Sequence, residues 1–212
     1  MKKLEILTIG LLSTQLIMAQ IPFHEGSLIV SENYGGDRDM VTIHFTSTPE
    51  NPAQRISSKI NSSYFTLSGE YGLSDLIGIG ITGSINNYYI NPNQLIKTWP
   101  LVASENAEAT INIHYIHSRR IDAYCTAGYG FSQLNYNIND GSNTTVAGSG
   151  TQADIGTTGR LYFGPFGISM SLDACMRNYD HLQGNQPSEE TLPASWSSMA
   201  YGANIGILYR IL

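Results

Sequence analysis

Residues 65–85 read FTLSGEYGLSDLIGIGITGSI, and this stretch decides the fold. In its second half, isoleucine recurs at alternate positions from Ile77, and small residues such as Gly78 fill the positions between. A period of two is typical of a β-strand with two unlike faces. The first half alternates in the same way from Phe65, and the halves meet at Leu73-Ser74-Asp75, whose composition indicates a tight turn. The stretch therefore predicts a β-hairpin.

The same unit recurs along the chain. Alternating segments flank two further short turns, at residues 118–120 and 164–165, and a last alternating segment runs from Tyr201 to Ile211. An opening strand at about residues 24–34 is expected to pair with this last one. Val41, Ile43 and Phe45 also alternate, and we interpret them as a strand extension inside a long loop. The sequence thus predicts eight strands, an even number as expected for a closed antiparallel barrel.

The connections between the predicted strands alternate in length. Three are tight, and four are long, at about residues 35–59, 91–106, 138–150 and 181–197. Short turns at one end and long loops at the other are typical of a transmembrane β-barrel whose long loops lie outside the cell. A secreted soluble ligand-binding barrel of the lipocalin kind is the alternative.

The composition favours a membrane barrel. Charged residues make up 13% of the 212 residues, which is about half the usual share. The polar faces of the predicted strands consist of Gly, Ser, Thr and Asn with few charges, and they suit the interior of a narrow barrel better than a solvated surface. The net charge of −6 disfavours a nucleic-acid partner. A girdle of aromatic residues at one membrane interface is expected from Tyr71, Tyr115, Phe163, Phe166 and Tyr209.

Residues 1–19 match a secretory signal peptide. Lys2 and Lys3 precede a short apolar stretch, and Ala19 before Gln20 offers a cleavage point. The apolar stretch is too short for a membrane anchor. We therefore expect one mature domain, the barrel, at residues 20–212.

Three features carry a resemblance to a known family: the signal ending in Ala19-Gln20, the hairpin YGLSDLIGIGITGS (71–84) and the final strand YGANIGILYRIL (201–212). The chain resembles the small eight-stranded outer-membrane β-barrel proteins of diderm bacteria, also described as the porin family or outer-membrane β-barrel domain group. The resemblance implies an all-β fold, an eight-stranded antiparallel up-and-down transmembrane β-barrel in the cell outer membrane. It also implies outer-membrane lipid and the barrel-assembly machinery as partners. Such chains often end in an aromatic residue that is recognised during assembly, whereas this one ends in Leu212, a difference that bears on assembly rather than on the fold.

The predicted inward faces carry a small set of charges. Four of them are expected at one depth near the tight turns, two of each sign, and Asp154 is expected to pair with Arg177 farther up. Isolated charges in so narrow a space would each cost on the order of several kcal/mol, so pairing is expected. We predict a lumen filled by side chains, with Tyr64, Tyr124 and Tyr162 among them. The four charges at one depth are Glu70, Asp122, Arg160 and Arg210, and Asp173 completes the predicted lumen charge cluster.

The two cysteines are expected to be unpaired. Cys125 lies on the predicted lipid face with Ile121 and Ala127. Cys175 lies on the predicted inward face with Asp173 and Arg177. Their strands are separated by another strand, and a disulfide needs Cα atoms within about 7 Å with converging Cβ vectors.

The sequence predicts no enzyme, metal site or cofactor. His117-Ser118 is the best candidate for lipid-directed catalysis, but no acid orients it, and we interpret it as a solvated turn. The five histidines are scattered, and Asp37, Asp39 and Asp140 are read as solvated loop residues. The expected function is a structural or surface-interaction role in the outer membrane, with an external partner that the sequence does not name. A small-solute pore and a lipid-modifying outer-membrane enzyme remain open alternatives.

Overall fold

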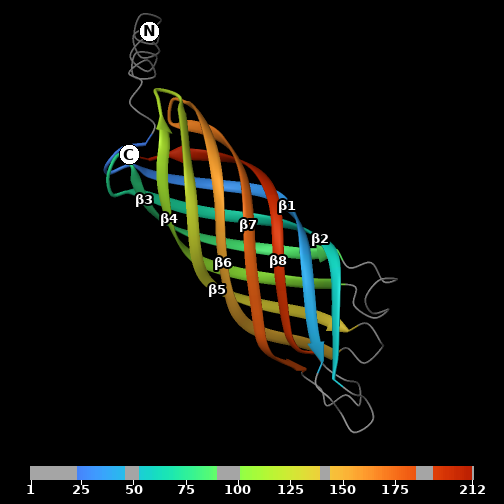
Figure 1. The fold of residues 1–212 in the computed structure, drawn as a ribbon. Coiled ribbons are helices and arrows are strands. Elements are labelled where there is room, and N and C mark those ends of the chain that lie inside the picture. The colour runs from blue at the N-terminus through green and yellow to red at the C-terminus, as the bar shows by residue number, and fades with distance from the viewer. Residues whose placement is uncertain (1–22, 46–52, 90–100, 139–143, 185–192, 212) are drawn as a thin grey trace, which may run out of the picture.

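Eight antiparallel strands close into a barrel in the computed structural model, which describes residues 23–45, 53–89, 101–138, 144–184 and 193–211 (Figure 1). Each strand pairs with its neighbours in the sequence, and the first strand (Leu28–Phe45) pairs with the last (Pro193–Arg210) to close the ring. None of the described residues forms a helix long and apolar enough to cross a membrane. The predicted all-β antiparallel fold is confirmed. Its strands are β1 (Leu28–Phe45), β2 (Gln54–Gly72), β3 (Ile77–Tyr89), β4 (Leu101–His117), β5 (Ile121–Ile138), β6 (Thr144–Phe163), β7 (Phe166–Gly184) and β8 (Pro193–Arg210).

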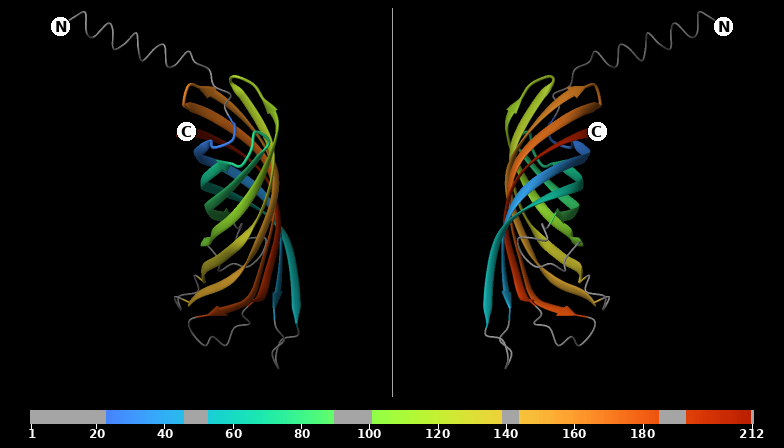
Figure 2. Two further views of the ribbon diagram at one scale, coloured as in Figure 1. Left: turned by 90° about the vertical axis from the view of Figure 1, so that its left-hand side faces the viewer. Right: turned by 90° about the vertical axis from the view of Figure 1, so that its right-hand side faces the viewer.

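The strands are strongly tilted in the barrel wall, as the side views show (Figure 2). Following paired residues once around the barrel from Glu32 leads back to β1 at Thr42, ten positions along the strand. For eight strands this stagger corresponds to a tilt of about 40°, and it leaves an interior just wide enough for side chains to fill. The lumen is therefore a packed space, and the identity of its side chains decides what the barrel can do.

The three short connections lie at one end of the barrel, which we call the turn end, and the opposite end is the loop end. The predicted tight turns are confirmed, because β2 and β3 are joined by residues 73–76, β4 and β5 by 118–120, and β6 and β7 by 164–165. Gly164 has a φ of 72°. A left-handed conformation of this kind suits glycine and allows a connection of two residues.

An apolar belt covers the outer surface near the turn end. On β7, for example, Phe166, Ile168, Met170 and Leu172 all point outward and are exposed. Ten residue steps, from Phe166 to Met176, span about 25 Å at the tilt of the strands, which is the height of the apolar band in membrane barrels. The predicted girdle residues are exposed on this belt near the turn end, and the rings of Phe166 and Tyr209 lie 4.9 Å apart.

The pattern inverts toward the loop end. On β7, Asn178 and Asp180 are the exposed residues, whereas Tyr179 and Leu182 are buried inside the barrel. From Met176 to Asp180 the strand keeps its alternation, and a register shift between β6 and β7 precedes Leu182. The large apolar side chains have thus moved from the outer to the inner face. This is the pattern of a solvated barrel with an apolar core. β7 therefore has a lipid-facing part near the turn end and a water-facing part near the loop end.

The predicted long loops extend into residues that belong to strands. The exchange of apolar and polar residues between the two faces near the loop end explains this error. The predicted loop 35–59 contains the last eleven residues of β1 and the first part of β2, which begins at Gln54. Val41 and Ile43 belong to β1 and are buried inside. The sequence prediction places apolar residues on the lipid face, and it therefore places the strand segments whose apolar residues point inward in loops. The other predicted loops are shortened in the same way by β4, β6, β7 and β8.

The predicted faces of the two cysteines are confirmed. Cys125 is exposed on the lipid face, Cys175 is buried in the lumen, and both are free.

Candidate functional site

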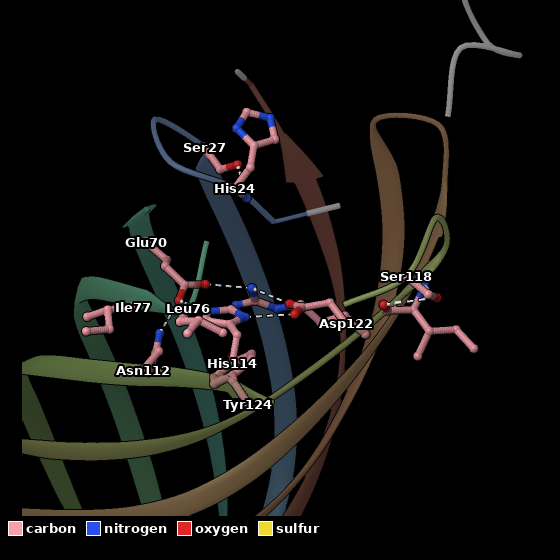
Figure 3. A network of polar contacts seen from close by, with 12 residues as sticks. His24, Ser27, Glu70, Leu76, Ile77, Asn112, His114, Ser118, Asp122 and Tyr124 are labelled. Atoms are coloured by element: carbon pink, nitrogen blue, oxygen red, sulfur yellow. Dashed lines mark hydrogen bonds and ion pairs between the residues drawn. The ribbon is translucent and has the colours of Figure 1, made fainter. Parts of the chain in front are cut away.

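The lumen holds a charged group at the turn end, which we call the turn-end cluster (Figure 3). Asp122 and Arg160 face each other across the paired strands β5 and β6, while Glu70 comes from β2. The nitrogen Nη1 of Arg160 lies 2.5 Å from Oε2 of Glu70 and 3.5 Å from Oδ2 of Asp122. All of these side chains are buried. The turn-end cluster comprises Glu70, Asn112, His114, Asp122, Tyr124 and Arg160.

His114 connects the two carboxylates of this cluster. Its Nε2 lies 3.0 Å from Oε1 of Glu70, and its Nδ1 lies 2.7 Å from Oδ1 of Asp122. A histidine ring donates from both nitrogens only when it is doubly protonated. The arrangement therefore fits an imidazolium that, with Arg160, balances two carboxylates by two cations.

Neutral groups complete the turn-end cluster. Asn112 donates from Nδ2 to Oε1 of Glu70, at 2.5 Å. Arg160 donates from Nη2 to the hydroxyl of Tyr124 at 2.8 Å, and its guanidinium carbon also lies 4.3 Å from the centre of the Tyr124 ring. The charges are thus enclosed by hydrogen bonds rather than left as bare ions in a buried space.

Direct contacts join three of the four charges predicted at this depth, Glu70, Asp122 and Arg160, and His114 is a further member that the prediction did not include. The fourth predicted charge, Arg210, is half-buried at the end of β8. Ile29, a buried residue of β1, pairs with both Glu70 and Arg210 and so stands between them. Glu70 instead extends over Gly78, where an added Cβ would clash with Oε1 of Glu70. The absence of a side chain at Gly78 thus opens the way toward His114.

The chain segment before β1 covers the turn end of the lumen. The ring of Phe23 stacks on the ring of His114 with centroids 3.4 Å apart and an angle of 8° between the planes. Phe23 is fully buried, with Ile29, Tyr162 and Leu208. The backbone N–H of Gly26 donates to the carbonyl of Gly72, which holds the segment against the barrel rim. Phe23 therefore forms an aromatic cap on the turn-end cluster.

A second charged group, the loop-end cluster of Asp37, Asp39 and Arg177, lies farther along the lumen. Arg177 Nη1 is 3.3 Å from Oδ1 of Asp39, and Nη2 is 3.6 Å from Oδ2 of Asp37. Arg177 also donates from Nε to Oε1 of Gln152 at 3.3 Å, and Ser62 donates to Oδ2 of Asp39 at 2.8 Å. All three charged side chains are at least nine-tenths buried.

The predicted pairing of Arg177 with Asp154 is wrong. Arg177 lies opposite Gln152 in the pairing of β6 with β7, while Asp154 lies opposite Cys175, one pleat nearer the turn end. The partners of Arg177 are instead Asp37 and Asp39, which were predicted to be solvated loop residues. They are buried residues of β1, two strands away around the barrel wall.

An apolar plug fills the lumen beyond the loop-end cluster. Trp196 is 1% exposed, and its ring meets that of Tyr88 edge-on with centroids 5.9 Å apart. Tyr88 also shares a hydrogen bond of 3.2 Å with Ser104, and Tyr179 one of 2.6 Å with Ser132. The apolar plug comprises Val41, Ile43, Ile60, Tyr88, Val102, Leu134, Tyr136, Val146, Tyr179, Leu182 and Trp196.

A polar chamber of about 130 Å³ remains between the two charged clusters. Besides Glu70 and Asp37 of the two clusters, three further carboxylates, Glu108, Asp154 and Asp173, line it. Gln152 donates to Oε2 of Glu108 at 2.6 Å, and Tyr64 donates to Oδ1 of Asp173 at 3.0 Å. The chamber lies between the capped turn-end cluster and the loop-end cluster, and the apolar plug follows beyond the loop-end cluster.

The histidine and serine that were considered for catalysis lie at the turn end, on the surface. His117 and Ser118 are exposed, and the Ser118 hydroxyl contacts the backbone of Ile121 within the turn. Within the described ranges, no group of three or more His, Cys, Asp or Glu residues is arranged to hold a metal ion. Asp140 lies outside the described residues.

Sequence reasoning missed several lumen residues. His114 was placed correctly on the polar face of its strand but was read as one of several scattered histidines. The alternation of β4 could have identified it, because His114 lies two residues after Asn112 and therefore also points inward, at the same end of the barrel as Asp122. Phe23 and Glu108 were also missed, and the role of Phe23 has no signal in the strand pattern, since it precedes the first strand.

Comparison with solved structures agrees with this architecture. The chain is similar to the outer-membrane protein AlkL, determined in lipid bilayers, with a TM-score of 0.59 and 12% identity over 89% of this chain and 92% of AlkL. It is also similar to the outer-membrane protein OprG from Pseudomonas aeruginosa, with a TM-score of 0.54 and 9% identity over 91% of this chain and 99% of OprG. No protein-family model matches the sequence, and no curated protein matches it. The fold is that of the small outer-membrane β-barrels, and the apolar belt gives it the surface of a membrane protein.

Proposed function

We propose that this protein is a closed outer-membrane barrel of the structural or surface-interaction type, which displays its four loops outside the cell and transports no solute through its lumen. The observation that carries the proposal is the closure of the lumen from both sides. Phe23 caps the turn-end cluster, and the apolar plug around Trp196 fills the loop end. A pore would need a continuous polar path, whereas here the path ends in packed apolar side chains.

The water-facing parts of the strands support a display role. Beyond the apolar belt, β1 and β2 continue as a paired ribbon to Phe45 and Gln54, with polar residues outside and apolar residues inside. A packed barrel of this kind is a rigid support for the connections at its end, because its core is filled like that of a soluble protein. The loops are therefore the part of the molecule best placed to meet a partner. The proposal assigns no reaction and no cofactor to the chain.

The orientation is tested by labelling single cysteines in intact cells. Cys125 and Cys175 are first replaced by alanine, and a cysteine is then introduced at Gln54, which is exposed at the loop end, or at Arg119, which is exposed in a turn. A membrane-impermeant maleimide should label Gln54→Cys in intact cells and Arg119→Cys only after the outer membrane is permeabilised. Folding of each variant is checked by its shift in gel mobility on heating.

The opposite labelling pattern, with Arg119→Cys reactive in intact cells, would reverse the orientation and overturn the proposal. Labelling of both positions in a soluble secreted fraction would instead favour a secreted ligand-binding barrel.

A further inference from the structure

The basic residues of this acidic chain are unevenly placed. Of its eleven Lys and Arg residues, two are buried in the lumen clusters, and three lie at the turn end. Three others point outward from the loop-end parts of two neighbouring strands, β1 and β2. The three are Arg38, Arg55 and Lys59, and the exposed His44 beside them completes what we call the basic patch.

The strand pairing brings the members of the basic patch together. Arg38 pairs with Asn61, and Lys59 stands two residues farther along the same face of β2. Diagonal neighbours of this kind lie about 7–8 Å apart, within reach of long side chains. His44 pairs directly with Arg55, so the patch runs as a column along the two strands toward the loop end.

The basic patch is not balanced by acidic groups on its own face. In the described parts of β8, β1, β2 and β3 beyond the apolar belt, the outward positions hold no carboxylate. On the next strand, β7, the exposed Asp180 is separated from His44 by Ser195 of β8. Asp37 and Asp39, the acidic residues nearest in sequence, point into the lumen, where they pair with Arg177. The charges of the patch are therefore available to an external anion, in a chain whose net charge is −6.

The position of the patch relative to the apolar belt indicates where that anion would lie. Arg38 pairs with Tyr201, an exposed aromatic residue of the belt on β8, while Lys59 and Arg55 lie progressively beyond it. The patch thus begins at the edge of the apolar belt, where one exposed apolar residue, Met40, still pairs with Lys59. We place this edge at the level of the lipid headgroups. Between its charges, the hydroxyls of Thr42 and Ser57 lie 3.0 Å apart on the outer face.

We propose that the basic patch binds the phosphate groups of a phosphorylated glycolipid in the outer leaflet of the outer membrane. Guanidinium and ammonium groups form strong charge-assisted hydrogen bonds with phosphate. Hydroxyl and amide groups on the same face, from Thr42, Ser57 and Asn61, suit the sugar that carries those phosphates. The assignment to the outer leaflet rests on the proposed orientation, with the loop end outside the cell.

The test measures binding of a fluorescent lipid A with two phosphates to the purified barrel in neutral detergent micelles. The triple variant Arg38→Gln, Arg55→Gln, Lys59→Gln is compared with the wild-type protein and with a control variant, Arg119→Gln, Arg120→Gln, at the turn end. Each basic residue near a charged membrane surface is worth about a fivefold change in affinity. We therefore expect roughly hundredfold weaker binding by the triple variant and an unchanged affinity of the control. Enzymatically dephosphorylated lipid A should bind the wild-type protein as weakly as the triple variant binds the intact lipid.

Equal binding of lipid A by the triple variant and the wild-type protein would overturn the proposal, as would equal binding of the dephosphorylated lipid. Full displacement of the lipid by low-millimolar inorganic phosphate would also overturn it, because the ligand would then be a free anion rather than a membrane glycolipid. The variants alter only exposed residues, and a heat-dependent gel shift verifies that each is folded. Since this experiment uses purified protein, its outcome is separate from the cysteine labelling, and reversed labelling would overturn the proposed function whatever the binding result.

Discussion

Glu70 shows how single residues stabilise the lumen. It contacts three side chains, from Asn112, His114 and Arg160, and it is 4% exposed. Removing one partner of a buried charge group leaves the other charge unpaired, and this is more costly than the net contribution of the pair itself. The turn-end cluster is therefore expected to respond strongly to the loss of either cation.

The substitution Arg160→Ala should lower the free energy of unfolding by about 3–5 kcal/mol, because Glu70 and Asp122 would then share one cation. The measurement is the urea midpoint of the barrel refolded in lipid vesicles, followed by the heat-dependent gel shift. Arg120→Ala is the control, since Arg120 is exposed in the turn. A change of less than about 1 kcal/mol for Arg160→Ala would mean that the lumen charges are solvated independently.

Glu32 is an acidic side chain on the lipid-facing part of β1. It is exposed, and it pairs with Leu67 of β2 and Ile207 of β8, which are both exposed apolar residues. A charge on the lipid face of a barrel destabilises it to an extent that depends on depth. We expect Glu32→Leu to raise the free energy of unfolding in vesicles by about 1–2 kcal/mol.

The matched control for Glu32 is Glu105→Leu, because Glu105 is exposed on β4 near the loop-end edge of the belt and should have a smaller effect. A lower stability of Glu32→Leu in the same urea titration would show that the Glu32 carboxylate has a stabilising partner in the membrane.

At the scale of single strands, the change of surface pattern along each strand determines where the membrane ends. In β1, the inward positions hold Ser31 and Asp37 and then Val41 and Ile43, while the outward positions change from Val30 to Arg38 and His44. The alternation of two never breaks, so the strand is continuous although its two faces exchange character.

Adjacent substitutions in β1 test this inversion. Val41 is 1% exposed in the apolar plug, so Val41→Asp buries a carboxylate among apolar side chains and should cost at least about 3 kcal/mol. Thr42 points outward into water, and Thr42→Asp should change the stability by less than about 0.5 kcal/mol. Urea midpoints of the two purified variants measure the difference, and the reverse order would place Val41 on the outer face.

The strands and turns were predictable because alternation and turn composition are local signals. Alternation predicts the Ile77 strand and the lumen position of Arg160. Composition predicts the Gly164-Pro165 turn. The loop-end strands were missed because the meaning of the apolar face reverses there, and the pairing of Arg177 was missed because it depends on the stagger of strands around the barrel. Contacts across a tilted barrel, such as that of Arg177 with Asp39, join residues far apart in the sequence, and no local pattern encodes their register.

At the scale of the whole molecule, the barrel consists of three layers along its axis. A capped charge cluster closes the turn end, a polar chamber occupies the middle, and an apolar plug closes the loop end. The two closures come from different parts of the chain, since Phe23 precedes the first strand and Trp196 belongs to the last. Loss of one closure would still leave the other in place.

The central claim, that the lumen is closed, is tested most directly by the current through planar lipid bilayers containing the purified protein. The account predicts no steady current for the wild-type protein, and none for Phe23→Ala, because the apolar plug remains. A variant that truncates the plug as well, Phe23→Ala with Trp196→Ala and Tyr179→Ala, should show measurable channel events if it remains folded by the heat-dependent gel shift. A stable open channel in the wild-type protein would contradict the account and identify the barrel as a pore.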